Sequence, residues 1–264
     1  MNSFQLHQPK DLAGASAFAA SGGDTRFLAG GQSILASMKL GLASPDAMID
    51  LSLVPDLKSI GVADGLVKIG AMVKHADVAA NADVQKAIPA LADLAGGIGD
   101  RQVRNMGTIG GSLANSDPAA CYPSAVLGLG ATIHTDKRSI AADSFFLGLY
   151  ETALEPGEII TAVSFPVPEK AAYVKFKNSA SRFALVGVFV SKGSQGVRVA
   201  VTGAASCAFR ATDIEKALAG SWTAAACNAV KMTADNLNSD LHASAEYRAH
   251  LIPVISGRAV AAAK

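Results

Sequence analysis

Two glycine-rich segments hold the residues of this chain best suited to bind a negatively charged ligand. The first is Ala29-Gly30-Gly31-Gln32-Ser33, and the second is Thr108-Ile109-Gly110-Gly111-Ser112. A diphosphate needs several backbone N–H donors that converge on it. Glycine permits the close approach and the positive φ that such convergence requires. The two segments together predict a dinucleotide site in which the diphosphate is held from two sides.

Each segment alone also has a plainer interpretation. A glycine pair after a strand is usually only a turn, and several glycines in a polar stretch are usually a surface loop. Neither segment matches the Rossmann pattern G-x-G-x-x-G or the Walker pattern G-x-x-x-x-G-K-[ST]. Folds built on those two patterns are therefore disfavoured.

The first glycine segment lies inside a predicted strand–turn–helix–strand unit. Residues 26–28 form a short strand, Ser33 is the expected N-cap of a helix over 34–40, and a second strand follows at 47–51. This βαβ-like arrangement places the glycine pair at a helix N-terminus, where the helix dipole favours an anion.

The second glycine segment lies in residues 96–123, which show little periodicity and predict a long functional loop. A hairpin with its turn at Asp64-Gly65 is expected before this loop. The remaining predicted elements of this half are helices at 75–80, 88–95 and 124–129 and strands at 131–135 and 159–165.

Pro166 and Pro168 mark the expected domain boundary, because two closely spaced prolines end the preceding strand. We expect a first domain over 1–167, with subdomains of about 1–56 and 57–167, and a second domain over 168–264. The second domain is predicted to contain strands at 172–176, 183–190 and 197–202, then helices at 211–218, 223–237 and 245–263. Strands followed by helices indicate an α+β fold.

Composition narrows the function further. The 264 residues carry a formal net charge of +1, which argues against nucleic-acid binding. Cys121, Cys207 and Cys227 are too far apart for an iron–sulfur or zinc motif, so they are expected to be free thiols. The polar segment Met1–Lys10 is unlike a signal peptide, and no stretch is apolar enough for a membrane span. A cytoplasmic protein is expected, and the five scattered histidines suggest no acid–base set.

Three longer strings resemble a known family. They are Leu28-Ala29-Gly30-Gly31-Gln32-Ser33, the stretch from Ile98 to Asn115 that reads IGDRQVRNMGTIGGSLAN, and Asp117-Pro118-Ala119-Ala120. Together with later matches as far as Glu246-Tyr247-Arg248, they resemble the FAD-binding medium subunit of molybdenum hydroxylases, the family of xanthine dehydrogenase and carbon monoxide dehydrogenase. The similarity covers essentially the whole chain.

This resemblance implies an α+β fold with a two-subdomain FAD-binding domain of the vanillyl-alcohol-oxidase (PCMH) type and a small α+β C-terminal domain. Carried over by position, the residues that would hold the FAD diphosphate and sugars are Leu28, Ala29, Gly30, Gly31, Gln32, Ser33, Ile34, Thr108, Ile109, Gly110, Gly111 and Ser112. Ile98 would pack near the dinucleotide, and Ile160, Lys177 and Phe183 would lie near the isoalloxazine ring.

Alternatives remain open at several of these positions. Lys177 could instead be a solvated lysine on a strand edge, and Phe183 a core aromatic. Arg104 beside the second glycine segment could contact phosphate or a partner, although a solvated charge is the default.

Cys121 departs from the family, which commonly has Asp there as a cofactor ligand. Asp117 could supply the missing contact. A catalytic thiol at Cys121 is the alternative to a simple substitution in the cofactor pocket.

The resemblance also implies the role of the chain. It would be an oxidoreductase subunit of a heterotrimer, relaying electrons from an iron–sulfur small subunit through FAD to an external acceptor. A molybdopterin large subunit would act on the organic substrate. The molybdopterin and iron–sulfur clusters would belong to those partners only. The alternative is a self-sufficient FAD-dependent reductase or oxidase of the same fold that acts directly on a small substrate.

Overall fold

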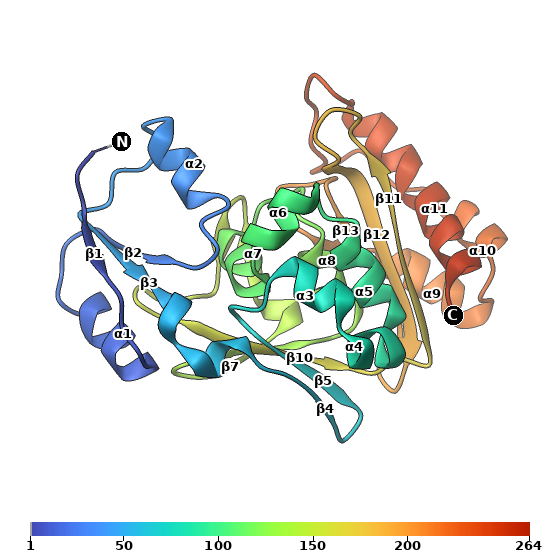
Figure 1. Ribbon diagram of the computed structural model, residues 1–264. Helices are drawn as coiled ribbons and strands as arrows, with labels where there is room; N and C mark the ends of the chain where they lie inside the picture. The colour runs from blue at the N-terminus through green and yellow to red at the C-terminus, as the bar shows by residue number, and fades with distance from the viewer. Residues whose placement is uncertain (1) are drawn as a thin grey trace.

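The computed structural model describes residues 2–264, whose strands form four sheets with helices packed between and around them (Figure 1). The first sheet has the order β1-β3-β2 and is parallel throughout. Its strands are β1 (Gln5–His7), β2 (Thr25–Leu28) and β3 (Ala47–Asp50), with helices α1 (Leu12–Ala19) and α2 (Ile34–Lys39) between them. The strand–turn–helix–strand prediction is therefore confirmed.

Ser33 lies at the predicted N-cap position, but the prediction that its side chain caps α2 is wrong. Ser33 precedes α2, but its φ of −97° and ψ of −53° are already helical, and its hydroxyl accepts no N–H of the helix. A capping side chain needs an extended backbone to reach back to the first turn. Asp11 at the start of α1 has that conformation and accepts from the Gly14 N–H at 2.7 Å.

The second sheet is antiparallel and has the order β4-β5-β10-β6-β7. The predicted hairpin at Asp64-Gly65 is confirmed. Both turn residues have positive φ (52° and 72°), as a tight two-residue hairpin requires. The strands are β4 (Ile60–Ala63), β5 (Leu66–Gly70), β6 (Thr132–Thr135), β7 (Ser139–Ala141) and β10 (Ile160–Pro166); β8 (Phe146–Gly148) and β9 (Glu151–Thr152) form a separate two-stranded sheet.

The long loop predicted over 96–123 is wrong, because most of this stretch is helical. Its helices are too short to show periodicity, but each is capped by a side chain: Asp100 accepts from the Val103 N–H, and Thr108 accepts from the Gly111 N–H. The helices of this part of the chain are α3 (His75–Ala80), α4 (Ala82–Ala87), α5 (Pro89–Gly96), α6 (Arg101–Met106), α7 (Ile109–Asn115) and α8 (Tyr122–Gly128).

The third large sheet, β11-β12-β13-β14, is antiparallel and lies between two groups of helices (Figure 1). Helices α5 and α8 pack on one face, and α9 and α11 pack on the other. The elements are β11 (Lys170–Lys177), β12 (Ala184–Gly193), β13 (Gly196–Thr202), β14 (Phe209–Arg210), α9 (Thr212–Gly220), α10 (Ala224–Asn228) and α11 (Ala245–Ala262). The α+β prediction for both halves of the chain is confirmed.

The helix predicted over 223–237 is wrong beyond Asn228. Residues 229–236 are irregular, and Asn236 has a φ of 63°, which is incompatible with a right-handed helix. Helix α10 is instead held at its start by Thr223, whose hydroxyl accepts from the Ala226 N–H.

Side chains of the third sheet tie it to the end of α8. The Ser191 hydroxyl donates to the Gly128 carbonyl at 2.6 Å, and the buried Arg198 Nε donates to the Leu127 carbonyl at 2.7 Å. The last carbonyls of a helix lack partners within it. Helix α8 is therefore capped by the C-terminal half of the chain.

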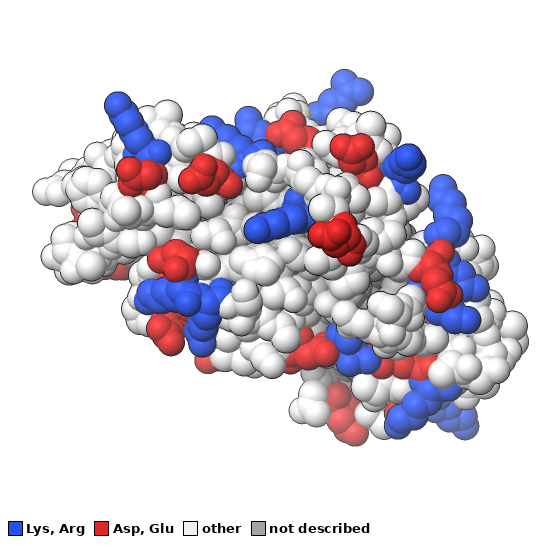
Figure 2. All heavy atoms as spheres, turned by 90° about the horizontal axis from the view of Figure 1, so that it is seen from below, with Lys and Arg blue, Asp and Glu red and all other residues white. Residues whose placement is uncertain are grey.

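The surface carries both signs of charge. Figure 2, which views the molecule from below relative to Figure 1, shows acidic and basic side chains interspersed rather than gathered into one field. Among residues 2–264 no helix combines the length and the apolar character needed to cross a bilayer.

Candidate functional site

The fold brings the two glycine-rich segments into contact. A Cβ atom on Gly30 would collide with the carbonyl group of Met106, two residues before Thr108. A Cβ on Gly111 would lie 3.3 Å from Ala29 Cβ. Only glycine allows the backbones to approach this closely.

The first segment presents unused backbone donors. Gly30, Gly31, Gln32 and Ser33 lie between β2 and α2, and their N–H groups find no acceptor within residues 2–264. Gly31 is buried and has a φ of +77°. Buried N–H groups are almost always hydrogen-bonded in proteins. The Gly31 N–H therefore needs an acceptor that the described chain does not supply, whereas the exposed Gln32 and Ser33 are open to solvent. An anionic group such as a diphosphate would accept from these neighbouring donors.

The second segment differs, because the scaffold already uses most of its donors. The Ile109 N–H donates to the Val73 carbonyl at 3.0 Å, and the Gly110 N–H donates to the Ala71 carbonyl at 2.9 Å. The Gly111 N–H is capped by Thr108 Oγ1 at 3.2 Å. These bonds fix the start of α7 to the segment that follows β5, and Gly111 lies next to Ala29 of the first segment.

Arg104 organises the stretch that leads into the second segment. Its Nη1 donates to the carbonyls of Ile98 and Gly99, at 3.0 and 3.3 Å. Ile98 is half-buried between α5 and α6. Arg104 therefore holds the backbone between α5 and α6 in place. The sequence-based interpretation of Arg104 as a solvated charge did not predict this role.

The turn from Asp117 to Cys121 is held by a hydrogen bond within the turn and by Thr202 of β13. Asp117 Oδ1 accepts from the Ala119 N–H at 2.8 Å, a local turn that asparagine and aspartate favour. From β13, Thr202 Oγ1 lies 2.8 Å from the Pro118 carbonyl and 2.6 Å from the Ala120 carbonyl. Thr202 was not recognisable from the sequence, because more than eighty residues separate it from these partners.

Cys121 ends this turn and is 5% exposed. The Lys175 ammonium on β11 lies 3.4 Å from Cys121 Sγ and donates to the Gly97 carbonyl at 2.9 Å. The sequence prediction singled out Lys177 instead, which is exposed at the end of the same strand. Alternation in the sequence would place both lysines on one face of the strand, but the register of β11 shifts between Phe176 and Lys177, and only Lys175 has these partners.

Two buried rings lie behind the glycine segments. His75 starts α3, its backbone N–H donates to the Gly107 carbonyl, and its ring centroid is 5.2 Å from that of Tyr122. Burial, with the nearby Arg104 guanidinium, lowers the pKa of His75 to about 4, and burial raises the pKa of Tyr122. Both groups are therefore uncharged at neutral pH. His75 Nδ1 and the Tyr122 hydroxyl have no hydrogen-bond partner among the described residues.

The remaining predicted site residues are distributed as follows. Ile160 is buried at the start of β10, and its neighbour Thr161 accepts from the Ala71 N–H, while Ala71 accepts from Gly110. This chain of bonds links β10 to α7. Phe183 is 53% exposed just before β12, so it is not the core aromatic of the alternative interpretation. No described contact joins Lys177 or Phe183 to the glycine segments.

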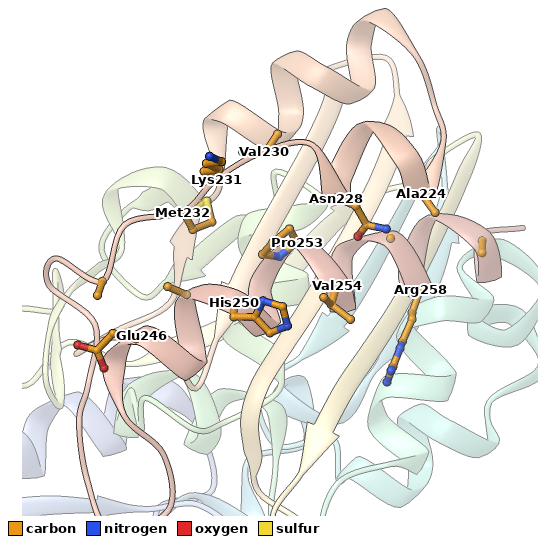
Figure 3. A pocket seen from close by; sticks show the side chains of 14 residues that line it. Ala224, Asn228, Val230, Lys231, Met232, Glu246, His250, Pro253, Val254 and Arg258 are labelled. Carbon is orange, nitrogen blue, oxygen red and sulfur yellow. The ribbon is translucent and has the colours of Figure 1, made fainter.

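A separate cavity of about 890 Å³ lies beside α11, on the face of the third sheet opposite to α5 and α8 (Figure 3). Its wall is formed by α10, the irregular residues 230–234 and the outward face of α11, with Lys231, His250 and Arg258 among its polar side chains. It contains none of the predicted site residues.

Comparison with known protein families covers nearly the whole chain. Residues 2–168 match the FAD binding domain in molybdopterin dehydrogenase, and residues 171–263 match the CO dehydrogenase flavoprotein C-terminal domain. The chain is 35% identical over 282 aligned positions to the carbon monoxide dehydrogenase medium chain of Afipia carboxidovorans, covering 99% of this chain and 97% of that one. It is 34% identical over 228 positions to the glyceraldehyde dehydrogenase medium chain of Sulfolobus acidocaldarius, with 82% and 81% covered.

Solved structures agree with the sequence matches. The carbon monoxide dehydrogenase of Hydrogenophaga pseudoflava contains a chain that superimposes with a TM-score of 0.90 at 33% identity, covering 99% of this chain and 97% of that one. Quinoline 2-oxidoreductase from Pseudomonas putida 86 gives a TM-score of 0.89 at 29% identity, with 99% and 96% covered. These matches confirm the predicted family and fold. The chain belongs to the FAD-binding medium subunits of the molybdenum hydroxylases, and is an oxidoreductase component of that family.

Proposed function

We propose that this chain is the electron-relay subunit of a heterotrimeric molybdenum hydroxylase. Electrons reach its FAD from iron–sulfur centres on a small partner subunit and leave to an external acceptor. A molybdopterin large subunit carries out the chemistry on the organic substrate. The observation that carries the proposal is the row of N–H donors from Gly30 to Ser33, which find no acceptor within residues 2–264 and lie in the segment that contacts Met106 and Gly111.

The residues divide the binding work between them. The donors of the first segment hold the diphosphate, and Thr108 to Ser112 close the opposite side without lending donors already used by the scaffold. Two further parts complete the pocket toward the isoalloxazine ring. One is Ile98, whose carbonyl accepts from Arg104, and the other is the turn from Asp117 to Cys121, which Thr202 holds. The bound FAD supplies the exchange between one- and two-electron transfer, and the protein tunes its potential. Ile160, Lys177 and Phe183 remain proposed neighbours of the ring.

We place the iron–sulfur and molybdenum centres on partner chains, and the possible metal-ligating side chains of this chain are consistent with that placement. Within residues 2–264 no three His, Cys, Asp or Glu side chains gather as a metal site. The three cysteines are separate free thiols. Relatives named as medium chains or FAD-subunits imply companion chains. We propose that the assembly is cytoplasmic. We also propose that the FAD-binding domain comprises residues 1–167 and the C-terminal domain residues 168–264.

The test compares the isolated chain with the assembly. The chain is purified, reconstituted with FAD, and its visible spectrum is recorded. It is then co-expressed with the gene products encoded beside it, and flavin bleaching is followed after addition of candidate aldehydes or N-heterocycles. We expect flavin binding by the isolated chain and substrate-driven bleaching only in the assembly.

Two outcomes would contradict the proposal. A colourless chain that takes up no FAD excludes the flavin site. Turnover of a nicotinamide donor or an organic substrate by the isolated chain, at the rate of the assembly, would instead support a self-sufficient flavoenzyme.

A further inference from the structure

The cavity beside α11 lies outside the proposed flavin site, and the proposed function gives it no occupant (Figure 3). Its volume of about 890 Å³ falls within the range of small-molecule sites, about 300–1,000 Å³. Its lining residues on α11 run from Glu246 to Ala261 at alternating intervals of three and one, which is the spacing of one helical face. That face is about 22 Å long at 1.5 Å per residue. The other side of α11 packs on β11 and β12.

The middle of the cavity is apolar. Ala249 and Pro253 are buried in its floor, and Val254 and Met232 are partly buried beside them. The apolar side chains of the lining are all aliphatic, because they come from alanine, valine, methionine and proline. Such a surface gains free energy when an aliphatic group covers it.

The two ends of the cavity differ in charge. Figure 3 shows Glu246 and Lys231 toward one end, where a carboxylate offsets an ammonium, and Arg258 toward the other. Within residues 2–264 no Asp or Glu oxygen lies within ion-pair distance of Arg258. Asn228 Oδ1 is 3.3 Å from the position of a Cβ on Gly257, the sequence neighbour of Arg258. A guanidinium without a counter-ion and a side-chain amide therefore lie together at this end.

We propose that the cavity binds an amphipathic organic anion of the medium-chain fatty carboxylate type. Its carboxylate pairs with Arg258, whose planar guanidinium can donate two parallel hydrogen bonds, and accepts from the Asn228 amide. Its chain covers Val254 and extends toward Met232. The distance along α11 from Arg258 to Ala249 is about 14 Å, enough for an extended chain of about ten carbons. This inference goes beyond the proposed function and does not depend on bound FAD.

The test measures binding of decanoate by isothermal titration calorimetry. Decanoate is titrated into the FAD-loaded full-length chain and into the co-expressed assembly, below the concentration at which it forms micelles. We expect saturable binding at one site in both. Octanoate should bind about tenfold more weakly, the loss expected for two buried methylene groups. Decyltrimethylammonium has the same chain with the opposite charge, and should show no saturable binding.

Three variants locate the site. Arg258→Met removes the guanidinium and should weaken decanoate binding about tenfold or more, the usual range for a hydrogen-bonded charged group. Val254→Asp places a carboxylate in the apolar middle and should abolish binding. Lys216→Met is the matched control, since it removes a lysine on α9 that is 77% exposed and does not line the cavity. FAD content and the unfolding midpoint are measured for each variant, and Arg258→Met decides if Val254→Asp does not fold.

The failures are distinguishable. An FAD-loaded chain without saturable decanoate binding overturns this inference and leaves the proposed function standing. Equal affinities for the parent and Arg258→Met, or equal binding of decanoate and decyltrimethylammonium, also overturn it. Binding by the isolated chain that is lost in the assembly would show that a partner chain fills the cavity, and would overturn the ligand in favour of a docking surface. A chain that binds decanoate but takes up no FAD contradicts only the proposed function.

Discussion

Gly30 and Met106 touch through their backbones, and no side chain at residue 30 fits between them. This contact joins two segments that are more than seventy residues apart in the sequence. The same approach brings Gly111 of the second segment next to Ala29 of the first.

Gly30→Ala is therefore expected to separate the two segments. The added methyl group would collide with the Met106 carbonyl, which belongs to the backbone and cannot rotate away. Overpacking of this kind costs about 1–3 kcal/mol. FAD retention, measured as the ratio of visible to protein absorbance after gel filtration, should fall strongly. Gly61→Ala is the matched control, since no atom lies within 4 Å of its added Cβ, and it should retain FAD.

Gly110 and Gly111 should respond differently to valine. A Cβ on Gly110 meets Ala71 Cβ at 2.5 Å in the buried scaffold, so Gly110→Val should lower the thermal unfolding midpoint even without FAD. A Cβ on Gly111 instead meets Thr108 Oγ1 at 2.9 Å and Ala29 Cβ at 3.3 Å, between the segments. Gly111→Val should lose FAD with less damage to the apoprotein. Equal loss of apoprotein stability in both variants would contradict this distinction.

The clasp of Thr202 on the turn from Asp117 to Cys121 gives a third prediction. Thr202→Val keeps the shape of the side chain but leaves the Ala120 carbonyl without a donor, at a cost of about 1–3 kcal/mol. The turn should loosen, and the FAD dissociation constant should rise. Thr202→Ser restores the hydroxyl and should recover most of the affinity, as measured by fluorescence titration with FAD. Equal affinities for the valine and serine variants would argue against the clasp.

Glu158 makes the stability of the FAD-binding half depend on acid. Hydrogen bonds from Arg138 and other donors lower the pKa of this buried carboxyl from 4.5 to about 2. A lowered folded-state pKa stabilises the protein above pH 4.5, and that stability is lost as the pH falls toward 2. The loss amounts to about 3 kcal/mol. Urea unfolding at pH 7 and pH 3 should show a smaller acid-induced loss for Glu158→Gln than for the parent.

Arg248 should be indispensable to the C-terminal half. It is 3% exposed, its Nη1 donates to the carbonyls of Leu185 and Gly203, and its Nη2 pairs with Asp240. Arg248→Met leaves all three acceptors without this donor and is expected to cost about 3 kcal/mol or more. Arg258→Met on the same helix is exposed, and should change the free energy of unfolding little. A Tm for Arg248→Met equal to that of Arg258→Met would exclude this role.

The sequence was sufficient for features that depend on local chemistry. Asp64-Gly65 predicted its hairpin because that turn needs two residues with positive φ, and the β2–β3 unit followed from its strand and turn residues. Helices α6 and α7 were missed because six or seven residues are too few to establish a period. Their caps, Asp100 and Thr108, were the signals available.

The site was predictable in its segments but not in its assembly. The glycine pairs suggested an anion site, yet nothing local reveals that the scaffold occupies the Ile109 and Gly110 N–H groups. Lys175 was passed over for Lys177 because their difference lies in the partners, Gly97 and Cys121, which are 78 and 54 residues away. Contacts at such separations depend on the packing of the third sheet against α5 and α8.

The packing of the third sheet against α5 and α8 limits how the two domains of such subunits can be exchanged between relatives. The carbonyls of Ala120, Leu127 and Gly128 accept from side chains of β12 and β13, and the Pro118 carbonyl accepts from the Gly203 N–H directly after β13. An exchange of C-terminal domains between relatives would therefore also exchange the groups that support α8 and the turn from Asp117 to Cys121, which we propose to line the cofactor pocket. Recombination between the two matched regions, 2–168 and 171–263, is expected to separate these supports from the segments that they hold. We therefore expect the two domains to be inherited together.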